Sequence, residues 1–367
     1  MRGALLAVLV LALARPGAAG ADEMVRIGVA TGLDRVQLSA PDLAASPLRD
    51  GAVRLPAAGD RAEVRLEGET LLLDGAPVEG AGVGFTSPGG IRYGGRVLSG
   101  EVEVRRGPGG LEVIDALPLE EYVAAVTGAE MPPAFPAQAL RAQAVAARTY
   151  ALARKLEALG EGRDFDLGST VLAQVYPGQG GGDARARAAA EATRGEVLVH
   201  DHQPIEAYFH SACGGRTESG AAALGRDEPY LKSVACGRCG DSPRARWTLQ
   251  VSAAELGRAV GLGRPATGAR VVSRTGSGRA ARVEIAANGR KARMAAVELR
   301  QRLGYDRLPS LAFSIRETRE GFAFAGVGSG HGAGLCQWGA AGRARAGEDY
   351  RAILRTYYPG TEIVKMY

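Results

Sequence analysis

The chain has 367 residues, of which 46% are hydrophobic, and it carries a formal net charge of +5 with a pI near 9.1. This length and composition predict a folded protein with one large domain or two ordinary ones. The positive charge comes from arginine spread along the chain and forms no basic block, which argues against a nucleic-acid-binding arm and suits an anionic polymer of the cell envelope.

The first 21 residues have the pattern of a secretory signal peptide. Arg2 precedes an apolar run from Gly3 to Ala14, and small residues lead to Ala21. The run has 12 residues, short of the roughly 20 that a membrane-spanning helix needs. We therefore expect residues 1–21 to be removed and the protein to be exported to a periplasm, the cell envelope or the medium, without a stable membrane span. An uncleaved anchor is the alternative.

Residues 22–110 read as a β-rich N-terminal portion. Short alternating runs such as AEVRLEG and TLLLDG are separated by glycine, proline and aspartate turns. The pattern then changes to helical spacing from Leu117, with Gly128 as the expected end of that helix. Pro136 opens a second, longer helix that extends to about Leu159. The sequence therefore predicts an α+β fold.

The rest of the chain divides by composition into three portions. Residues 111–244 form a core that contains the two predicted helices and most of the cysteines. Residues 245–308 alternate between helical and strand patches and are expected to form an insertion or a subdomain. Residues 309–367 return to the core and contain the glycine-dense loop GVGSGHGAGLCQWGA.

Three stretches together resemble the SpoIID/LytB family of bacterial cell-wall proteins. They are LPLEEYVAAVTGAEMPPAFPAQALRAQAVAARTYAL, the segment AYFHSACGGRTES, and GSGHGAGLCQWGAAGRARAG followed by ILRTYYPGT. The resemblance implies a lytic transglycosylase that cuts peptidoglycan glycan strands, preferably strands stripped of stem peptides. It also allows a non-catalytic modifier that enhances a cell-wall amidase, as LytB-type proteins do. The family's catalytic glutamate falls on Glu130, and the arginine of its A-x-A-A-R-T-Y motif falls on Arg148.

The residues around Glu130 suit an acid catalyst. Cleaving a glycosidic bond requires a proton on the leaving oxygen, and burial can keep a carboxyl group protonated near neutral pH. Met131 and Pro132 are apolar, and the prolines are expected to hold Glu130 on a stiff extended segment. A lytic enzyme can use one carboxyl group as acid and then as base. Glu120 and Glu121 are candidates for a second carboxylate, so a two-carboxylate hydrolase stays open.

Four further side chains are candidates for substrate binding. Arg148 has a planar donor set suited to carboxylate or N-acetyl groups, with a structural ion pair as the alternative. His331 and Gln337 of the glycine-rich loop are candidates for hydrogen bonds to sugar hydroxyls. Trp338 offers a flat face for stacking, with a place in the core as the alternative.

The cysteine region has the ligand types and spacing of a tetrahedral Cys₃His zinc site. His210-x-x-Cys213 is followed, after 22 intervening residues, by Cys236-x-x-Cys239. Four protein ligands would make such a zinc site structural. A Cys236–Cys239 or Cys213–Cys236 disulfide and a thiol redox motif are the alternatives. Cys336 is interpreted as a buried core cysteine rather than as a nucleophile.

Overall fold

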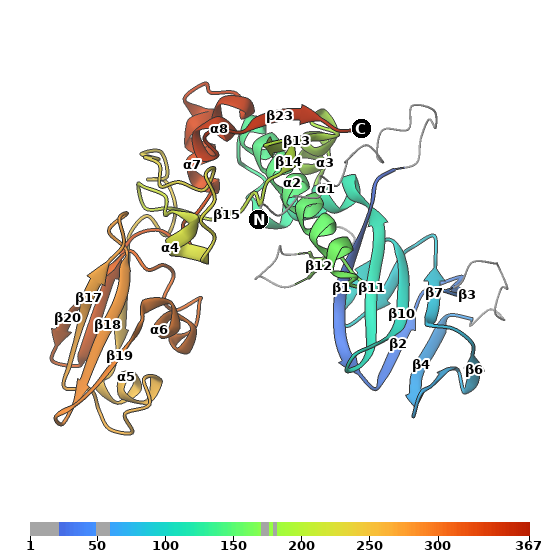
Figure 1. Ribbon diagram of the computed structural model, residues 1–367, viewed down its shortest axis with the longest axis horizontal. Helices are drawn as coiled ribbons and strands as arrows, with labels where there is room; N and C mark the ends of the chain where they lie inside the picture. The colour runs from blue at the N-terminus through green and yellow to red at the C-terminus, as the bar shows by residue number, and fades with distance from the viewer. Residues whose placement is uncertain (1–21, 49–58, 170–175, 179–181) are drawn as a thin grey trace, which may run out of the picture.

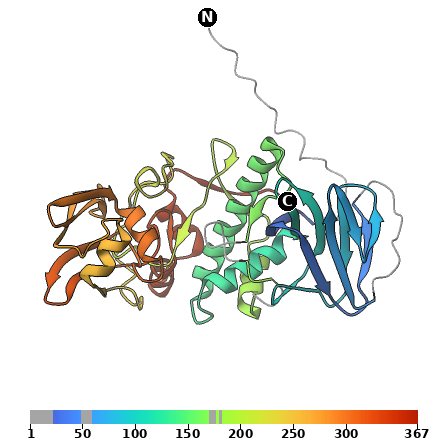
Figure 2. The same ribbon diagram turned by 90° about the horizontal axis from the view of Figure 1, so that it is seen from below.

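The computed structural model describes residues 22–48, 59–169, 176–178 and 182–367. The predicted signal peptide, residues 1–21, lies outside the described residues. The molecule is elongated, with a β-rich N-terminal part, a helical central part and a smaller distal part in a row (Figure 1). Figure 2 shows the same three parts from below.

The N-terminal part consists of two six-stranded sheets. One has the order β12 (Leu167–Gly168), β1 (Met24–Leu33), β11 (Gly110–Pro118), β10 (Glu101–Gly107), β7 (Gly82–Thr86) and β3 (Ala44–Pro47). The other has the order β6 (Ala76–Val78), β5 (Thr70–Leu73), β4 (Arg61–Glu67), β2 (Arg35–Ser39), β8 (Ile91–Tyr93) and β9 (Arg96–Leu98). Alternate residues such as Val36 and Val64 of the second sheet share one hydrophobic core with Ile27 and Val104 of the first.

The central part is organised around helix α2 (Ala137–Glu161), which packs against α1 (Leu119–Glu130), α3 (Ala184–Ala192), α7 (Gln337–Arg345) and α8 (Tyr350–Tyr357). Small alanine side chains occupy much of its buried surface, which lets the neighbouring helices approach closely. Pro136 precedes its first turn, and Gly162 ends it with φ of +66°. A three-stranded sheet of β14 (Gln203–Pro204), β13 (Glu196–His200) and β23 (Glu362–Lys365) lies beside these helices (Figure 1).

The distal part has its own hydrophobic core, separate from that of the rest of the chain. It contains the sheet β16 (Trp247–Val251), β21 (Gly321–Gly326) and β20 (Phe313–Thr318), and the sheet β17 (Gly268–Arg274), β18 (Ala280–Ala287) and β19 (Arg290–Ala295). Helices α5 (Ala253–Ala259) and α6 (Ala296–Leu303) complete it. The chain returns to the central part through β22 (Leu335–Cys336), which pairs in parallel with β15 (Phe209–His210). The short helix α4 (Gly220–Leu224) follows β15 in the chain.

The predicted α+β class and the β-rich N-terminal portion are confirmed. One local prediction is wrong. Helix α1 does not end at Gly128 but continues to Glu130, and the extended conformation starts at Met131, with φ of −122° and ψ of 135°. Glu130 is therefore the last residue of a helix and does not lie on an extended segment. Among the described residues, no helix is both long enough and apolar enough to cross a bilayer.

Candidate active site

A cleft of about 380 Å³ lies where the central part meets the distal part. Its lining residues come from the end of α1, from α2, from β15, from α4, from the glycine-rich loop and from the region of α6: Glu130, Tyr150, Tyr208, Phe209, His210, Ala223, Leu224, Val297, Arg300, Tyr305, Gly330 and His331. Most of these side chains are aromatic or aliphatic. Glu130 is the only carboxyl side chain that lines this cleft among the residues described.

Glu130 is partly buried and is held from the side of α7. The Nε2 amide of Gln337 donates a hydrogen bond to Oε2 of Glu130 at 3.3 Å, and the same nitrogen lies 3.5 Å from Oε1 of Gln143 on α2. Gln143 and Gln337 are both buried. Gln337, which was predicted to form hydrogen bonds with sugar hydroxyls, therefore contacts Glu130 itself in the structure.

His331 and His210 both line the cleft, with their rings 5.5 Å apart. The Ala333 amide N–H donates to Nδ1 of His331, so Nε2 of His331 carries the proton that it donates to the Phe209 carbonyl at 2.8 Å. Both ring nitrogens of His331 are thus occupied by the backbone, which argues against the predicted hydrogen bonds to sugar hydroxyls. Burial lowers the pKa of His331 to about 4.

His210 has a different arrangement. Its Nδ1–H donates to the Ala333 carbonyl at 2.9 Å, which leaves Nε2 as a buried acceptor with no partner among the described residues. Burial holds the pKa of His210 well below its ordinary value, so the ring is neutral. The structure therefore places His210 at the cleft as an acceptor for a ligand O–H or N–H, and not among the cysteines as a metal ligand.

Arg148 is fully buried and forms a structural ion pair. Its Nε and Nη2 atoms donate to the two carboxylate oxygens of Glu120 at 2.8 and 2.6 Å, and its remaining donors reach the carbonyls of Ala190 and Glu196 at 3.1 Å. Burial raises the pKa of Glu120, but Arg148 outweighs this effect and the pKa lies below the ordinary value. Of the two predicted roles for Arg148, the structural one fits, and contact with a substrate does not.

Trp338 does not line the cleft. Its ring packs edge to face against Phe135 at 4.9 Å, and it is partly buried against the main core. Trp338 therefore packs against the core, which was the alternative to stacking on a sugar. Sequence reasoning missed Arg300 and Tyr305, which reach the cleft from the distal part. Arg300 donates to the carbonyls of Leu308 and Pro309 and stacks over Tyr305 at 4.9 Å.

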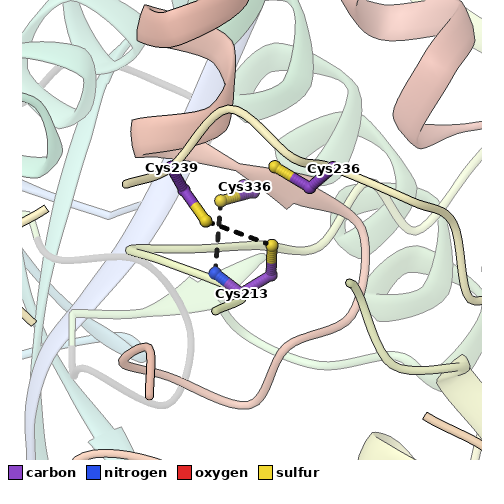
Figure 3. A group of neighbouring side chains, drawn as sticks. All are labelled: Cys213, Cys236, Cys239 and Cys336. Atoms are coloured by element: carbon purple, nitrogen blue, oxygen red, sulfur yellow. Dashed lines mark hydrogen bonds between the residues drawn. The ribbon is translucent and has the colours of Figure 1, made fainter. Parts of the chain in front are cut away.

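A second cluster lies close to the cleft and consists of four buried thiols. Cys213 follows β15, Cys236 and Cys239 lie on the loop before β16, and Cys336 ends β22. Their Sγ atoms all lie within 4.8 Å of one another, and the Sγ atoms of Cys213 and Cys239 are 3.6 Å apart. Figure 3 shows the four sulfur atoms converging on one point. Cys336 takes the fourth position, where the sequence pattern predicted His210.

The parallel pairing of β15 with β22 explains this substitution. It aligns His210 with Cys336 and brings the latter from beyond the distal part to the side of Cys213. The backbone N–H groups of Cys213 and Gly339 donate to Sγ of Cys336 at 3.2 and 3.3 Å, while burial raises the pKa of this thiol well above its ordinary value. The sequence contained one signal for the inclusion of Cys336, since the chain has four cysteines and a tetrahedral site needs four ligands.

The geometry of the four thiols fits a tetrahedral metal better than a disulfide. None of the four cysteines is disulfide-bonded. Disulfide sulfurs are about 2.05 Å apart, whereas four thiolates around zinc at about 2.3 Å stand roughly 3.8 Å from one another. The 3.6 Å separation of Cys213 and Cys239 is close to the second value. The guanidinium of Arg279, which donates to the Cys213 carbonyl at 2.7 Å, supplies positive charge beside the cluster.

Comparison with known proteins defines the class. A family model described as a stage II sporulation protein, SpoIID, matches residues 108–200, and a model described as a domain of unknown function matches residues 241–334. Both segments contribute residues to the cleft, because Glu130 and Tyr150 lie in the first and Arg300 and His331 in the second.

The relatives agree with this class. The chain is 32% identical to stage II sporulation protein D of Bacillus subtilis (strain 168) over 268 residues, which cover 68% of this chain and 75% of that protein. It is 37% identical to an uncharacterised protein of Brachyspira hyodysenteriae over 258 residues, 69% and 68% of the two chains. An amidase enhancer of Bacillus subtilis is 27% identical over 286 residues, 64% of this chain and 39% of that protein. The chain belongs to the SpoIID family.

Proposed function

We propose that this protein is exported, acts on the bacterial cell wall and cleaves stripped peptidoglycan glycan strands as a lytic transglycosylase, with Glu130 as the catalytic residue. The observation that carries the proposal is the cleft, in which Glu130 is the single carboxyl side chain among the described lining residues. Membership of the SpoIID family supports the cell-wall substrate.

The chemistry needs one carboxyl group that works twice. Glu130 first gives its proton to the glycosidic oxygen as the bond to the anomeric carbon breaks. The resulting carboxylate then takes the proton of a hydroxyl group of the same sugar. The oxygen of this hydroxyl group attacks the anomeric carbon. An anhydro ring forms, no water is consumed, and Glu130 ends protonated. The buried amide of Gln337 orients the carboxyl group through both steps.

Several features of the surroundings of Glu130 favour its protonated form, and the guanidinium of Arg300, which also lines the cleft, acts against them. The apolar walls formed by side chains such as Phe209, Leu224 and Val297 limit the hydration of a carboxylate. The C-terminal end of a helix carries partial negative charge, which disfavours an added negative charge on its last residue. His210 and His331 are neutral neighbours and supply no compensating positive charge.

A two-carboxylate hydrolase is less consistent with the positions of the other glutamates on α1. Glu120 is ten residues before Glu130 on the same helix, which corresponds to about 15 Å along the axis at 1.5 Å per residue. Hydrolases place their two carboxyl groups roughly 5 to 9.5 Å apart. Glu120 is also bound to Arg148, and Glu121 is exposed.

We also propose that the four cysteines hold one structural zinc ion. The ion would complete a closed tetrathiolate site and supply no chemistry to the reaction. Cys336 immediately precedes Gln337, so fixing its thiolate fixes the start of α7 and the amide that contacts Glu130. The role of the site is then to keep Gln337 in register with the acid.

Glu130→Gln tests the assignment, because the substituted amide keeps the shape of the side chain and cannot donate the acid proton. The substrate is glycan from amidase-treated sacculi, and both release of soluble fragments and binding to the insoluble glycan are measured. The proposal expects the wild type to release fragments and the variant to bind without releasing them. Absence of fragments with the folded wild type would overturn the enzyme assignment.

The relationship to the amidase enhancer favours one alternative function, in which the same cleft binds glycan and stimulates an amidase without cutting. This alternative predicts that the wild type and Glu130→Gln stimulate peptide release by an added cell-wall amidase equally. The transglycosylase proposal predicts fragment release by the wild type in the absence of any amidase.

A further inference from the structure

The interpretation that the positive charge is spread along the chain is wrong at the scale of domains, because the distal part is far more basic than the rest. Residues 241–334 contain sixteen arginine and lysine residues and seven aspartate and glutamate residues, a net charge of +9 against +5 for the whole chain. The remaining residues are therefore net negative. A charge separation of this size within one chain indicates that the distal part meets an anionic partner.

Part of this charge gathers around a hollow of about 840 Å³ that is distinct from the cleft. Arg246, Arg274 and Arg279 line it from the distal part, and Arg216 lines it from the loop after Cys213. Its floor contains the buried rings of Trp247 and Phe313, and hydroxyl groups such as those of Thr248 and Ser277 stand among the arginines. Among the described lining residues of this hollow there is no carboxylate.

Two of the four guanidinium groups are held in place by neutral acceptors. Arg274 donates to the carbonyls of Gly278 at 2.8 Å and Phe313 at 3.2 Å. Arg279 is only 4% exposed and donates to the Cys213 carbonyl at 2.7 Å and to Oγ of Ser277 at 2.8 Å. Its Nε–H is buried and has no partner among the described residues. Carbonyl acceptors orient these groups without neutralising them.

The other two are exposed, and within the described parts of the chain neither Arg216 nor Arg246 forms an ion pair. A carboxylate that acts on Arg279 belongs to the buried Glu218, whose Oε2 accepts hydrogen bonds from Thr275 and Ser277. Glu218 and the proposed zinc tetrathiolate, with its net charge of −2, offset much of the positive charge on the side of the hollow formed by Cys213 and Arg279. The exposed Arg216 and Arg246 keep the open side positive. Planar guanidinium forks on a rigid floor suit carboxylate ligands, which they can bind in a bidentate way.

We propose that this hollow is an accessory binding site for the carboxylate groups of stripped glycan strands, an inference that rests on the proposed function. Hydrolysis of the amide bond between a stem peptide and its sugar adds water and leaves one carboxylate on that sugar. A stripped strand therefore carries sugar carboxylates at regular intervals. While the peptides are attached, each of these carboxyl groups is part of an amide bond and has no charge. The arginines select strands that an amidase has already processed.

The position of the hollow suits this role. The segment of residues 326–331 borders both sites, because Gly326 and Val327 line the hollow while Gly330 and His331 line the cleft. A strand bound in the hollow is thereby kept next to Glu130. The distal part then adds affinity and selectivity for stripped glycan, and the reaction itself stays at the cleft.

The test is a binding measurement on the full chain in a Glu130→Gln background, so that no strand is cut. Three probes are compared: soluble stripped glycan, the same glycan with its carboxylates converted to neutral methylamides, and a poly(glycerol phosphate) polymer. The double variant Arg216→Ala/Arg246→Ala removes the two exposed charges. Arg290→Ala/Arg319→Ala is the matched control, because it removes the same charge from exposed positions of the distal part that do not line the hollow.

We expect the dissociation constant for stripped glycan to rise about tenfold in the hollow variant and to stay within about twofold in the control. Methylamide glycan should bind the unmodified hollow as weakly as stripped glycan binds the hollow variant. Equal binding of charged and neutral glycan, or equal loss in both double variants, overturns the proposal. Preferential loss of binding to the phosphate polymer also overturns it in favour of another anion. Carboxylate-dependent binding without any cleavage by the wild type would retain this site and reject the enzyme assignment.

Discussion

Replacing Arg148 with methionine should destabilise the protein strongly while leaving the chemistry of the cleft intact. The Arg148 side chain has no exposed surface, and that of its partner Glu120 is 10% exposed. Methionine retains most of the aliphatic volume but removes every donor. The Glu120 carboxylate would then remain buried with weaker partners, the N–H of Gly195 and the hydroxyl of Tyr367.

The expected loss follows from this geometry. Breaking a buried ion pair by removing one partner costs about 3–5 kcal/mol, because an uncompensated charge is left behind. The carbonyls of Ala190 and Glu196 also lose their donor, so the loss should fall toward the upper half of this range. The double variant Glu120→Gln/Arg148→Met removes the stranded charge and should recover part of the loss.

Urea unfolding followed by circular dichroism measures these free energies of unfolding. Arg141→Met is the control on the same helix, since Arg141 is only partly buried, and a change of about 0.5 kcal/mol or less is expected. Binding of stripped glycan by Arg148→Met, measured in conditions where the variant is folded, should match the wild type. Normal stability with lost glycan binding would refute the structural role and restore Arg148 as a substrate contact.

Three further predictions concern the thiol cluster, the histidines and the distal wall of the cleft. Removing metal with a chelator, or substituting Cys336→Ser, should lower both the melting temperature and the rate of glycan cleavage, and elemental analysis should find about one zinc per chain before treatment. Burial lowers the pKa of His331 to about 4, so the unfolded chain binds more protons than the folded protein between pH 6.5 and 4. As the pH falls through this window, His331 should therefore lower the free energy of unfolding by at most about 3 kcal/mol. His331→Gln should reduce that slope, and His210, whose pKa burial also holds well below its ordinary value, should maintain the remainder. Arg300→Lys should reduce kcat/KM on stripped glycan by roughly tenfold, since Lys cannot hold the Leu308 and Pro309 carbonyls together as the guanidinium fork does, and this wall of the cleft would shift.

Each of these has a result that would contradict it. Full activity and unchanged melting of metal-free, reduced protein would remove the metal from the account. A pH slope that persists unchanged in His331→Gln would assign it to other groups, for which His200→Gln, a substitution outside the cleft, is the control. Wild-type kinetics of Arg300→Lys would show that the position of this wall does not affect the reaction, and Arg302→Lys on the same helix is its matched control.

The fold class could be predicted because it depends on local patterns. Alternating apolar residues between turn residues gave the N-terminal strands, and Pro136 marked the start of α2. The end of α1 could not be predicted from Gly128, because a single glycine costs a helix only about 1 kcal/mol. Buried residues of α1 such as Tyr122 and Val126 pack in the main core, and this tertiary contact carries the helix on to Glu130.

The candidate site was only partly predictable for a related reason. Glu130 and Gln337 carried motif signals, and the structure brings them together. The contact of Cys336 with the other three cysteines depends on the pairing of β15 with β22, which no sequence spacing encodes. The burial of Arg148 likewise depends on the arrival of α3 and β13 beside α2. Its almost wholly apolar neighbours one turn away on the helix were the available hint.

The most direct test of the central claim is the chemical nature of the new ends made from stripped glycan by the wild type and by Glu130→Gln. Mass spectrometry before and after borohydride reduction separates the two possibilities, because anhydro ends are one water lighter than hydrolysed ends and resist reduction. The account predicts anhydro ends from the wild type and no new ends from Glu130→Gln. Reducible ends from the wild type, or anhydro ends from the variant at the wild-type rate, would contradict it.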